Sequence, residues 1–330
     1  MVKIPAYLSI TTQVTMLDFE RPIHDLESKI RELRHLSDDG QINIATEVTR
    51  MQAKIERLLR QTYKDISADQ IVKVARHPER PHYLDYVKAL ITDYTPLAGD
   101  RLYSEDAALV GGIGKLNGRP VVIMGQEKGH DTETRIHHNF GMPKPEGYRK
   151  AQRLVKMAEQ FNLPVVTMVD TAGAYPGVEA EERGQSEAIA RSIDVFLGAQ
   201  TPIVSTIIGE GGSGGAIAIA AADRILMLEY SVYSVISPEG CASILWRSAE
   251  YSKQAALALR LTARDLEELG VIDTVIEEPL GAAHRAREET FHRVGMAIEA
   301  ALDELAPFSG LELRRKRAEK FLAMGQKGLV

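Results

Sequence analysis

Apolar residues recur at spacings of three and four in two stretches near the N-terminus. The first stretch covers 23–33 and the second covers 48–58, on either side of Asp38-Asp39-Gly40. This spacing puts apolar side chains on one face of an α-helix, and the segment between them has the composition of a turn. The pattern therefore predicts a helical hairpin, whose narrow apolar stripes suit each other or a partner subunit.

A different pattern begins beyond residue 100. Apolar runs at 107–115 and 120–125 flank Asn117-Gly118, a dipeptide typical of a tight β-hairpin. Further along, short apolar runs rich in β-branched residues alternate with helical periodicity. Buried strands separated by helices are typical of a largely parallel sheet, so we expect the α/β class. The runs predict strands at 164–169, 202–208, 224–228, 232–236 and 271–276, and helices at 148–161, 181–197 and 214–222.

Composition and charge narrow the possible partners. The chain has 330 residues, of which 44% are hydrophobic and 26% charged, with a formal net charge of −6. This charge gives no general attraction to nucleic acid or to an anionic membrane, and the basic residues of the hairpin alternate with glutamates. The longest apolar run, 216–222, is far shorter than the roughly 20 residues that span a bilayer. We therefore expect a cytoplasmic protein with no membrane or nucleic-acid partner.

Cysteine and histidine content argues against a metal site. A single cysteine, Cys241, excludes an intrachain disulfide and any zinc or iron–sulfur site built from several cysteines. Its neighbours offer no cation or histidine that would favour a thiolate, so we expect a small buried residue. His130, His137 and His138 are joined by no pattern of carboxylates and are interpreted as part of an exposed loop or a lid.

Two glycine-bearing segments follow two of the predicted strands. They are the loops Asp170–Gly177 and Gly209–Gly215, and the carboxyl ends of parallel strands are where ligands bind, so both loops are expected to line one crevice. The backbone N–H groups of Gly214, Gly215 and Ala216 fall in the first turn of the next helix. There they lack intrahelical acceptors and lie at the positive end of the helix dipole, which favours negative charge on an oxygen.

The glycine-rich segment Gly209–Gly215 can also be compared with the motifs of nucleotide-binding sites. Gly209, Gly211 and Gly214 have the spacing of the dinucleotide fingerprint, and Glu229 follows at the right distance for an NAD ribose. The predicted helix of about nine residues is short for that motif, and the earlier glycine segment is unexplained by it. An NAD-binding oxidoreductase therefore stays a secondary alternative, as does a purely structural role for the glycines. A P-loop lacks its Gly-Lys-Ser/Thr ending.

Several segments of the sequence resemble a known family. The longer ones are 169–177, 182–190, 208–219 and 233–242, and the shorter ones are Ala75-Arg76-His77-Pro78 and Asn139–Pro143. These segments resemble the alpha subunits of bacterial acetyl-coenzyme A carboxylase carboxyltransferases, and the resemblance extends over about 17–285. Ala172 stands where proline is expected in many relatives, which relaxes the turn slightly without removing an N–H group.

The resemblance implies a crotonase-like fold of repeated β-β-α units that follows the helical hairpin. The organisation expected from it is an N-terminal extension at 1–16, the hairpin and a connecting region at 17–100, and a carboxyltransferase domain at 101–300. A helical tail at 301–330 completes the chain, and its basic segment 313–317 is interpreted as a surface segment.

The resemblance also implies a reaction and a site. Such enzymes move a carboxyl group from carboxybiotin, borne by the biotin carboxyl carrier protein, to acetyl-CoA, which gives malonyl-CoA for fatty acid synthesis. By similarity, the N–H groups of Gly214 and Gly215 form the oxyanion hole on the biotin side. Lys156 lies in a predicted amphipathic helix, so no biotin is expected on this chain. The substrate-binding residues implied are Ala172, Gly173, Tyr175, Gly211, Gly212, Ser213 and Ala216.

Partners follow from the same resemblance. A beta subunit is expected to supply the second oxyanion hole and the zinc ribbon of the family, in an alpha2-beta2 assembly that works with biotin carboxylase.

The main alternative function is that of an enoyl-CoA hydratase or isomerase of the same superfamily, with Glu239 as an acid. Against it, Ala216–Ala218 stand where a second carboxylate is needed. A non-catalytic scaffold is the other alternative. Lys128 and Arg135 are candidates for coenzyme A phosphate contacts on charge alone, and acetyl against propionyl specificity stays open.

Overall fold

The N-terminal unit is the expected helical hairpin. The computed structural model describes residues 16–38 and 45–326, which fall into two compact units divided after Asp65. A short 3-10 helix, η1 (Asp18–Glu20), leads into α1 (Arg21–Asp38) and α2 (Ala45–Lys64). The Tyr63 hydroxyl donates a hydrogen bond of 2.5 Å to Glu20 and ties the end of α2 to the start of α1. Residues 1–15, most of the expected extension 1–16, lie outside the described residues.

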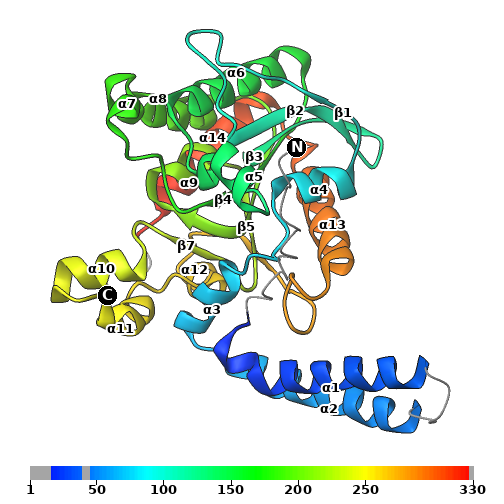
Figure 1. Cartoon of the computed structure of the whole chain (residues 1–330). Helices are drawn as coiled ribbons and strands as arrows, with labels where there is room; N and C mark the ends of the chain where they lie inside the picture. The colour runs from blue at the N-terminus through cyan, green and yellow to red at the C-terminus, as the bar shows by residue number, and fades with distance from the viewer. Residues whose placement is uncertain (1–15, 39–44, 327–330) are drawn as a thin grey trace, which may run out of the picture. The chain divides into compact units, whose positions relative to one another are not determined.

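The second unit is built on one mixed sheet (Figure 1). Its strand order is β1-β2-β3-β4-β5-β6-β8, and β7 pairs with β5. β2 pairs antiparallel with β1 and with β3, and all later pairings are parallel. The strands are β1 (Ile91–Pro96), β2 (Leu109–Leu116), β3 (Arg119–Gln126), β4 (Val165–Thr171), β5 (Ile203–Gly212), β6 (Arg224–Leu228), β7 (Val232–Ser234) and β8 (Thr274–Ile276).

Helices fill the crossovers between strands. Most predicted elements are confirmed, but the helix expected at 181–197 is divided, because Gly184 has a φ of +80° that an α-helix does not accept. The described helices are α3 (Ala68–Ala75), α4 (Tyr83–Leu90), α5 (Thr132–His137), η2 (Asn139–Gly141), α6 (Pro145–Phe161), α7 (Val178–Glu182), α8 (Gln185–Gly198), α9 (Ser213–Ala220), α10 (Pro238–Trp246), η3 (Ala249–Tyr251), α11 (Ser252–Ala258), α12 (Ala263–Glu268), α13 (Arg287–Leu305) and α14 (Gly310–Ala323).

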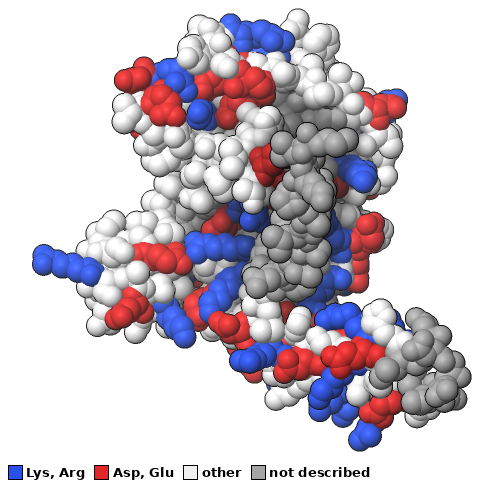
Figure 2. All heavy atoms as spheres, in the orientation of Figure 1, with Lys and Arg blue, Asp and Glu red and all other residues white. Residues whose placement is uncertain are grey.

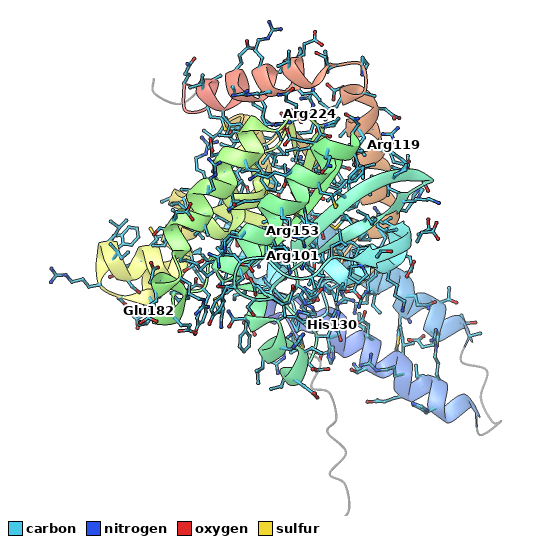
Figure 3. All side chains as sticks on the ribbon, turned by 90° about the horizontal axis from the view of Figure 1, so that it is seen from above. Arg101, Arg119, His130, Arg153, Glu182 and Arg224 are labelled. Carbon is cyan, nitrogen blue, oxygen red and sulfur yellow. The ribbon has the colours of Figure 1, made fainter. Side chains whose placement is uncertain are left out.

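The central strands of the sheet are buried on both faces, as β4 illustrates. Val165 and Val169 pack into the cluster that includes side chains of α6, α8 and α9, whereas Val166 and Met168 pack into the cluster with α4 and α13. This alternation follows from the two-residue period of a strand. Ion pairs of Arg119 with Asp303 and of Arg224 with Glu304 attach β3 and β6 to α13; Figure 3 labels the two arginines. No helix in the described part of the chain is long and apolar enough to cross a bilayer.

The C-terminal helix is integral to this unit. Leu313 and Arg317 are buried, so the interpretation of 313–317 as a surface segment is wrong for these two residues. The guanidinium of Arg317 donates to Asp223 at 3.0 and 2.6 Å and to the carbonyls of Phe196, Ala199 and Thr201 at 2.7–2.9 Å. Sequence periodicity could not reveal this arrangement, because the charged partner lies 94 residues away.

Candidate functional site

The two glycine segments meet at the carboxyl edge of the sheet. Thr171 at the end of β4 pairs with Gly211 near the end of β5. A Cβ atom on Gly212 would lie 2.2 Å from the carbonyl oxygen of Ala172, and one on Gly215 would lie 2.6 Å from the carbonyl carbon of Gly173. These separations are too short for any side chain, so glycine is required at both positions. The backbones of the two segments are therefore in direct contact.

The glycine run is not the loop that the sequence suggested. β5 continues through it to Gly212, because residues 210–212 form parallel pairs with β7. A Cβ atom on Gly211 would lie 2.7 Å from the Tyr233 ring, which explains one more glycine. Ser213, with a φ of +46°, then turns the chain sharply into α9. The run is thus a strand end and a helix start joined at a single strained residue.

Gly214 and Gly215 are the second and third residues of α9. The residue that precedes the helix, Gly212, has no side chain to cap it. Amides at these positions lack intrahelical acceptors and lie at the positive end of the helix dipole. Ala216, by contrast, is fully buried and is the first residue whose amide an ideal helix supplies with an acceptor. The turn can therefore stabilise an anionic oxygen through Gly214 and Gly215.

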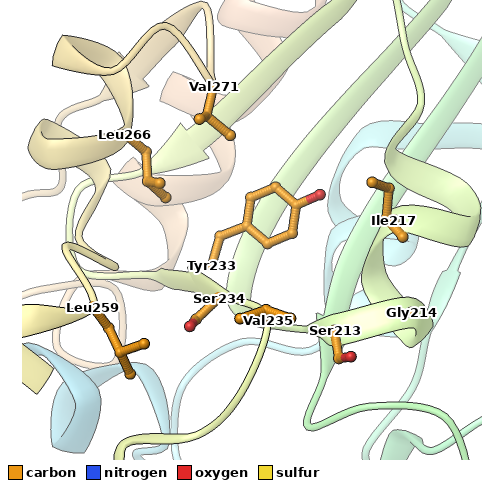
Figure 4. Close-up of a pocket in the computed structure, with 9 residues that line it drawn as sticks. All are labelled: Ser213, Gly214, Ile217, Tyr233, Ser234, Val235, Leu259, Leu266 and Val271. Carbon is orange, nitrogen blue, oxygen red and sulfur yellow. The ribbon is translucent and has the colours of Figure 1, made fainter. Parts of the chain in front are cut away.

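A cavity of about 370 Å³ opens beside this turn (Figure 4). Ser213, Gly214 and Ile217 form one wall, and Tyr233 presents its ring and hydroxyl to the interior. Burial raises the pKa of Tyr233 to about 12, so its hydroxyl is protonated and can donate at neutral pH. The remaining walls are mostly apolar: Ser234, Val235, Leu259, Leu266 and Val271.

Of the residues predicted to bind substrate, only Ser213 lines this cavity, together with the predicted oxyanion residue Gly214. Ala172, Gly173, Gly211 and Gly212 lie at the neighbouring strand ends. Tyr175 is held elsewhere in its own turn: its amide donates to the carbonyl of Pro143 at 3.0 Å, and the Lys144 ammonium lies 5.1 Å from the centre of its ring.

A buried network of polar side chains, which the sequence analysis did not predict, lies next to the turn between β5 and α9. The Lys128 ammonium lies 2.8 Å from Asp170 and 2.8 Å from Glu210, and His82 lies 3.0 Å from the other oxygen of Asp170. Burial opposes the charge of Lys128, but the two carboxylates outweigh it and raise the pKa of Lys128. Burial likewise opposes ionisation of Asp170, but Lys128 and His82 hold its pKa below the ordinary value. Lys128 is thus engaged by carboxylates, and the suggested phosphate contact is not supported.

Arg76 extends the network to the surface. Its guanidinium lies 2.6 Å from Glu210 and 2.8 Å from Glu239. Burial works against ionisation of both carboxyls, yet the neighbouring cations keep the pKa of Glu210 and of Glu239 below their ordinary values. Glu239 is therefore an anion paired with arginine, which argues against the role of acid that the hydratase alternative gives it. These contacts could not be predicted from local sequence patterns, because Arg76 lies 134 and 163 residues from its partners.

The remaining candidates have local roles. His130 lies 3.1 Å from Asp85, and that hydrogen bond raises the pKa of His130. His138 lies 2.6 Å from the carbonyl of Ala107, and its ring contacts that of His137 edge to face. In the described ranges, no group of three or more His, Cys, Asp and Glu side chains could hold a metal ion. Cys241 is buried in α10, as predicted.

Sequence comparisons agree with the resemblance. The family profile described as acetyl co-enzyme A carboxylase carboxyltransferase-like matches residues 16–325. A protein of Rhodospirillum centenum named acetyl-coenzyme A carboxylase carboxyl transferase subunit alpha is 66% identical over 313 residues, which cover 95% of this chain and 99% of the relative. A protein of the same name from Paramagnetospirillum magneticum is 60% identical over 95% of this chain and 99% of the relative.

Solved structures support the fold. The transcarboxylase 12S core with methylmalonyl-coenzyme A has a TM-score of 0.56 at 20% identity, over 69% of this chain and 42% of the transcarboxylase chain. A Pseudomonas malonate decarboxylase hetero-tetramer in complex with coenzyme A has a TM-score of 0.57 at 18% identity, over 73% of this chain and 94% of that chain. The expected crotonase-like α/β fold is confirmed by these neighbours.

Proposed function

This chain belongs to the acetyl co-enzyme A carboxylase carboxyltransferase-like family, and we propose that the turn between β5 and α9 is its part of the active site. The chain is the alpha subunit of such a carboxyltransferase, as its relatives are named. The proposed reaction moves the carboxyl group of carboxybiotin to acetyl-CoA and yields malonyl-CoA. Fatty acid synthesis is the use that the family name implies.

One observation carries the proposed site. The backbone around Gly215 is pressed against Gly173 and Ala174, and the uncapped first turn of α9 is fixed by that contact. Amides held in this way can stabilise negative charge that develops on a carbonyl oxygen during transfer, without rearrangement. Loss of one such donor typically costs roughly 2.7–4 kcal/mol in the transition state. We assign this role to Gly214 and Gly215.

The residues present suit biotin as the group that meets these amides. Biotin supplies a transferable carboxyl group when it arrives as carboxybiotin on the biotin carboxyl carrier protein. Gly214 lines the cavity without a side chain, and Ile217, Val235 and Leu266 offer apolar contacts beside it. Tyr233 would donate a hydrogen bond to a polar atom of the bound group.

The second half of the site is proposed to come from a beta subunit. Exposed apolar side chains gather on α10, η3, α11 and the segment before α10, a region in which Figure 2 shows white spheres with charged side chains among them. Val235 belongs both to this surface and to the cavity, so a chain that covers the surface also closes the cavity. An alpha2-beta2 assembly, with a zinc ribbon on the beta subunit and biotin carboxylase as a further component, is the arrangement we propose. The exposed residues are Val235, Ile244, Leu245, Trp246, Tyr251 and Leu257.

The alternative functions fit less well. A hydratase needs two carboxyl groups, but Glu239 is paired with Arg76, and α9 offers only Ala216–Ala218 at the second position. An NAD site needs a glycine loop before its helix, whereas β5 runs to Gly212 and α9 has only eight residues. A scaffold role predicts that changes in the glycine segments leave transfer intact, whereas changes in the helical hairpin abolish assembly.

Reconstitution tests the proposal. The purified chain is mixed with a candidate beta subunit, biotin and malonyl-CoA, and acetyl-CoA formation is followed in the reverse direction. We expect transfer by the mixture and none by either chain alone. Activity of this chain by itself would contradict a divided site. A parallel reaction with methylmalonyl-CoA, the product expected from propionyl-CoA, would determine the acyl preference.

A further inference from the structure

One buried amide side chain forms a hydrogen bond to each of the two glycine segments. Gln126, the last residue of β3, is fully buried. Its side-chain carbonyl accepts the backbone N–H of Asp170 at 3.1 Å, and its side-chain NH2 donates to the carbonyl oxygen of Gly215 at 3.1 Å. A single side chain thus reaches from β3 to the end of β4 and to the first turn of α9.

The orientation of this amide is determined by its partners. The Asp170 N–H can only donate, and the Gly215 carbonyl can only accept. Rotation of the amide by 180° would place oxygen against oxygen and N–H against N–H. Only a group with one donor and one acceptor in this order satisfies both ends, and glutamine is the neutral side chain that provides them over this span.

Asp170, one of the two hydrogen-bond partners of Gln126, has further polar contacts of its own. The Asp170 carboxylate accepts the backbone N–H of Glu210 in β5 at 3.0 Å, in addition to its contacts with Lys128 and His82. Gln126 and Asp170 therefore link the carboxyl ends of β3, β4 and β5 to α9. Because Gly215 also abuts Gly173 and Ala174, α9 is located by contact on one side and by a hydrogen bond on the other.

From this geometry we infer that Gln126 is a positioning residue for carboxyl transfer: it sets the place of the Gly214 and Gly215 amides through its hydrogen bond to Gly215. The inference rests on the proposed role of those two amides. Gln126 has no exposed surface, so it acts through Gly215 and not on a substrate. Small displacements matter, since a misplacement of about 1 Å at a reacting group can reduce a rate roughly a hundredfold.

Two substitutions test this role in the assembled complex. Gln126→Met fills the space but neither donates nor accepts, so we expect kcat to fall roughly tenfold or more while KM for malonyl-CoA changes little. Gln126→Glu is isosteric and can donate only when protonated. Burial and the Asp170 carboxylate favour its protonated form, whereas the Lys128 ammonium, 2.8 Å from Asp170, favours its charged form, so protonation becomes complete only as pH falls. We therefore expect the ratio of its kcat to that of the unchanged complex to approach one near pH 6 and to fall as pH rises.

A matched control exists in α6. The Gln152 side chain also donates to a backbone carbonyl, that of Ala188, at 3.0 Å, but it joins α6 to α8 and contacts neither glycine segment. Gln152→Glu should leave the kcat ratio near one at every pH. Thermal unfolding at each pH shows whether a variant is folded, and the Gln126→Glu complex at pH 6 is the folded reference.

The kinetics of these variants distinguish a positioning role of Gln126 from a role in packing alone. A Gln126→Met complex with unchanged kcat, or a Gln126→Glu ratio that does not vary with pH, would overturn the positioning role and leave Gln126 as a packing residue. A falling ratio for Gln126→Glu, with a constant one for Gln152→Glu, would establish it. If the unchanged complex shows no carboxyl transfer at all, the proposed function fails, and this result is distinguishable from failure of the Gln126 inference.

Discussion

Substitution of Gly215 by alanine perturbs the proposed site by one methyl group and keeps the backbone N–H. The added Cβ would lie 2.6 Å from the Gly173 carbonyl carbon and 2.6 Å from the Ala174 nitrogen. Ordinary contact begins near 3.4 Å, so the two backbones must separate by about 0.8 Å, the difference between these distances. Both contacts are to backbone, and no flexible side chain can move aside.

A shift of this size moves the Gly214 and Gly215 amides relative to the oxygen that they stabilise. We expect kcat to fall roughly a hundredfold, equivalent to about 2.7 kcal/mol at 1.36 kcal/mol per factor of ten. The assay is acetyl-CoA formation from malonyl-CoA and biotin in the assembled complex. Gly214→Ala should lose less, because its Cβ would meet only the Ile189 side chain at 3.5 Å.

The control for this pair is Gly198→Ala at the end of α8, where an added Cβ meets nothing within 4 Å. It should transfer at the unchanged rate. If Gly215→Ala folds, binds its partner and retains the full rate, the reasoning that links this backbone contact to catalysis is refuted.

Three further predictions concern other parts of the second unit. Tyr233→Phe should reduce kcat/KM for biotin roughly tenfold by removing one donor, and equal kinetics for the two proteins would exclude a role for the hydroxyl. Arg317→Met should lower the free energy of unfolding in urea by about 3–5 kcal/mol, because Asp223 is left buried and unpaired; a loss under about 1 kcal/mol would contradict this. Asp85 raises the pKa of His130, so its stabilisation is complete below the unfolded value of about 6.5 and is lost as pH rises through the folded pKa. The difference in Tm between the unchanged protein and His130→Asn should thus be largest near pH 6 and shrink by pH 9, and a constant difference would disagree.

Much of the fold was predictable because its signals are local. Asn117-Gly118 identifies the β2–β3 hairpin, and 224–228 is a strand with the same bounds in sequence and structure. The extension of β5 to Gly212 was not predictable, because glycine has low strand propensity. Pairing with β7, a partner chosen by tertiary structure, overrides that preference.

The candidate site was predictable only in outline. The glycine pattern and the resemblance led to the turn at Gly214 and Gly215. The hydrogen bonds and ion pairs of the polar residues next to the turn were not predictable, because the two partners of each contact come from distant parts of the chain. Gln126 lies 89 residues from Gly215, and Lys128 lies 82 residues from Glu210. Buried hydrogen-bond networks produce no periodic pattern in a sequence, so the hydrogen bonds that position the turn could not be predicted.

The most direct test of the central claim is a structure of the assembled complex with biotin and coenzyme A bound. A carbonyl oxygen of biotin should lie about 2.7–3.2 Å from the backbone nitrogen of Gly214 or Gly215, with the ring against Ile217 and Tyr233. Biotin bound away from the first turn of α9, with no acceptor within hydrogen-bonding distance of these two amides, would contradict the account.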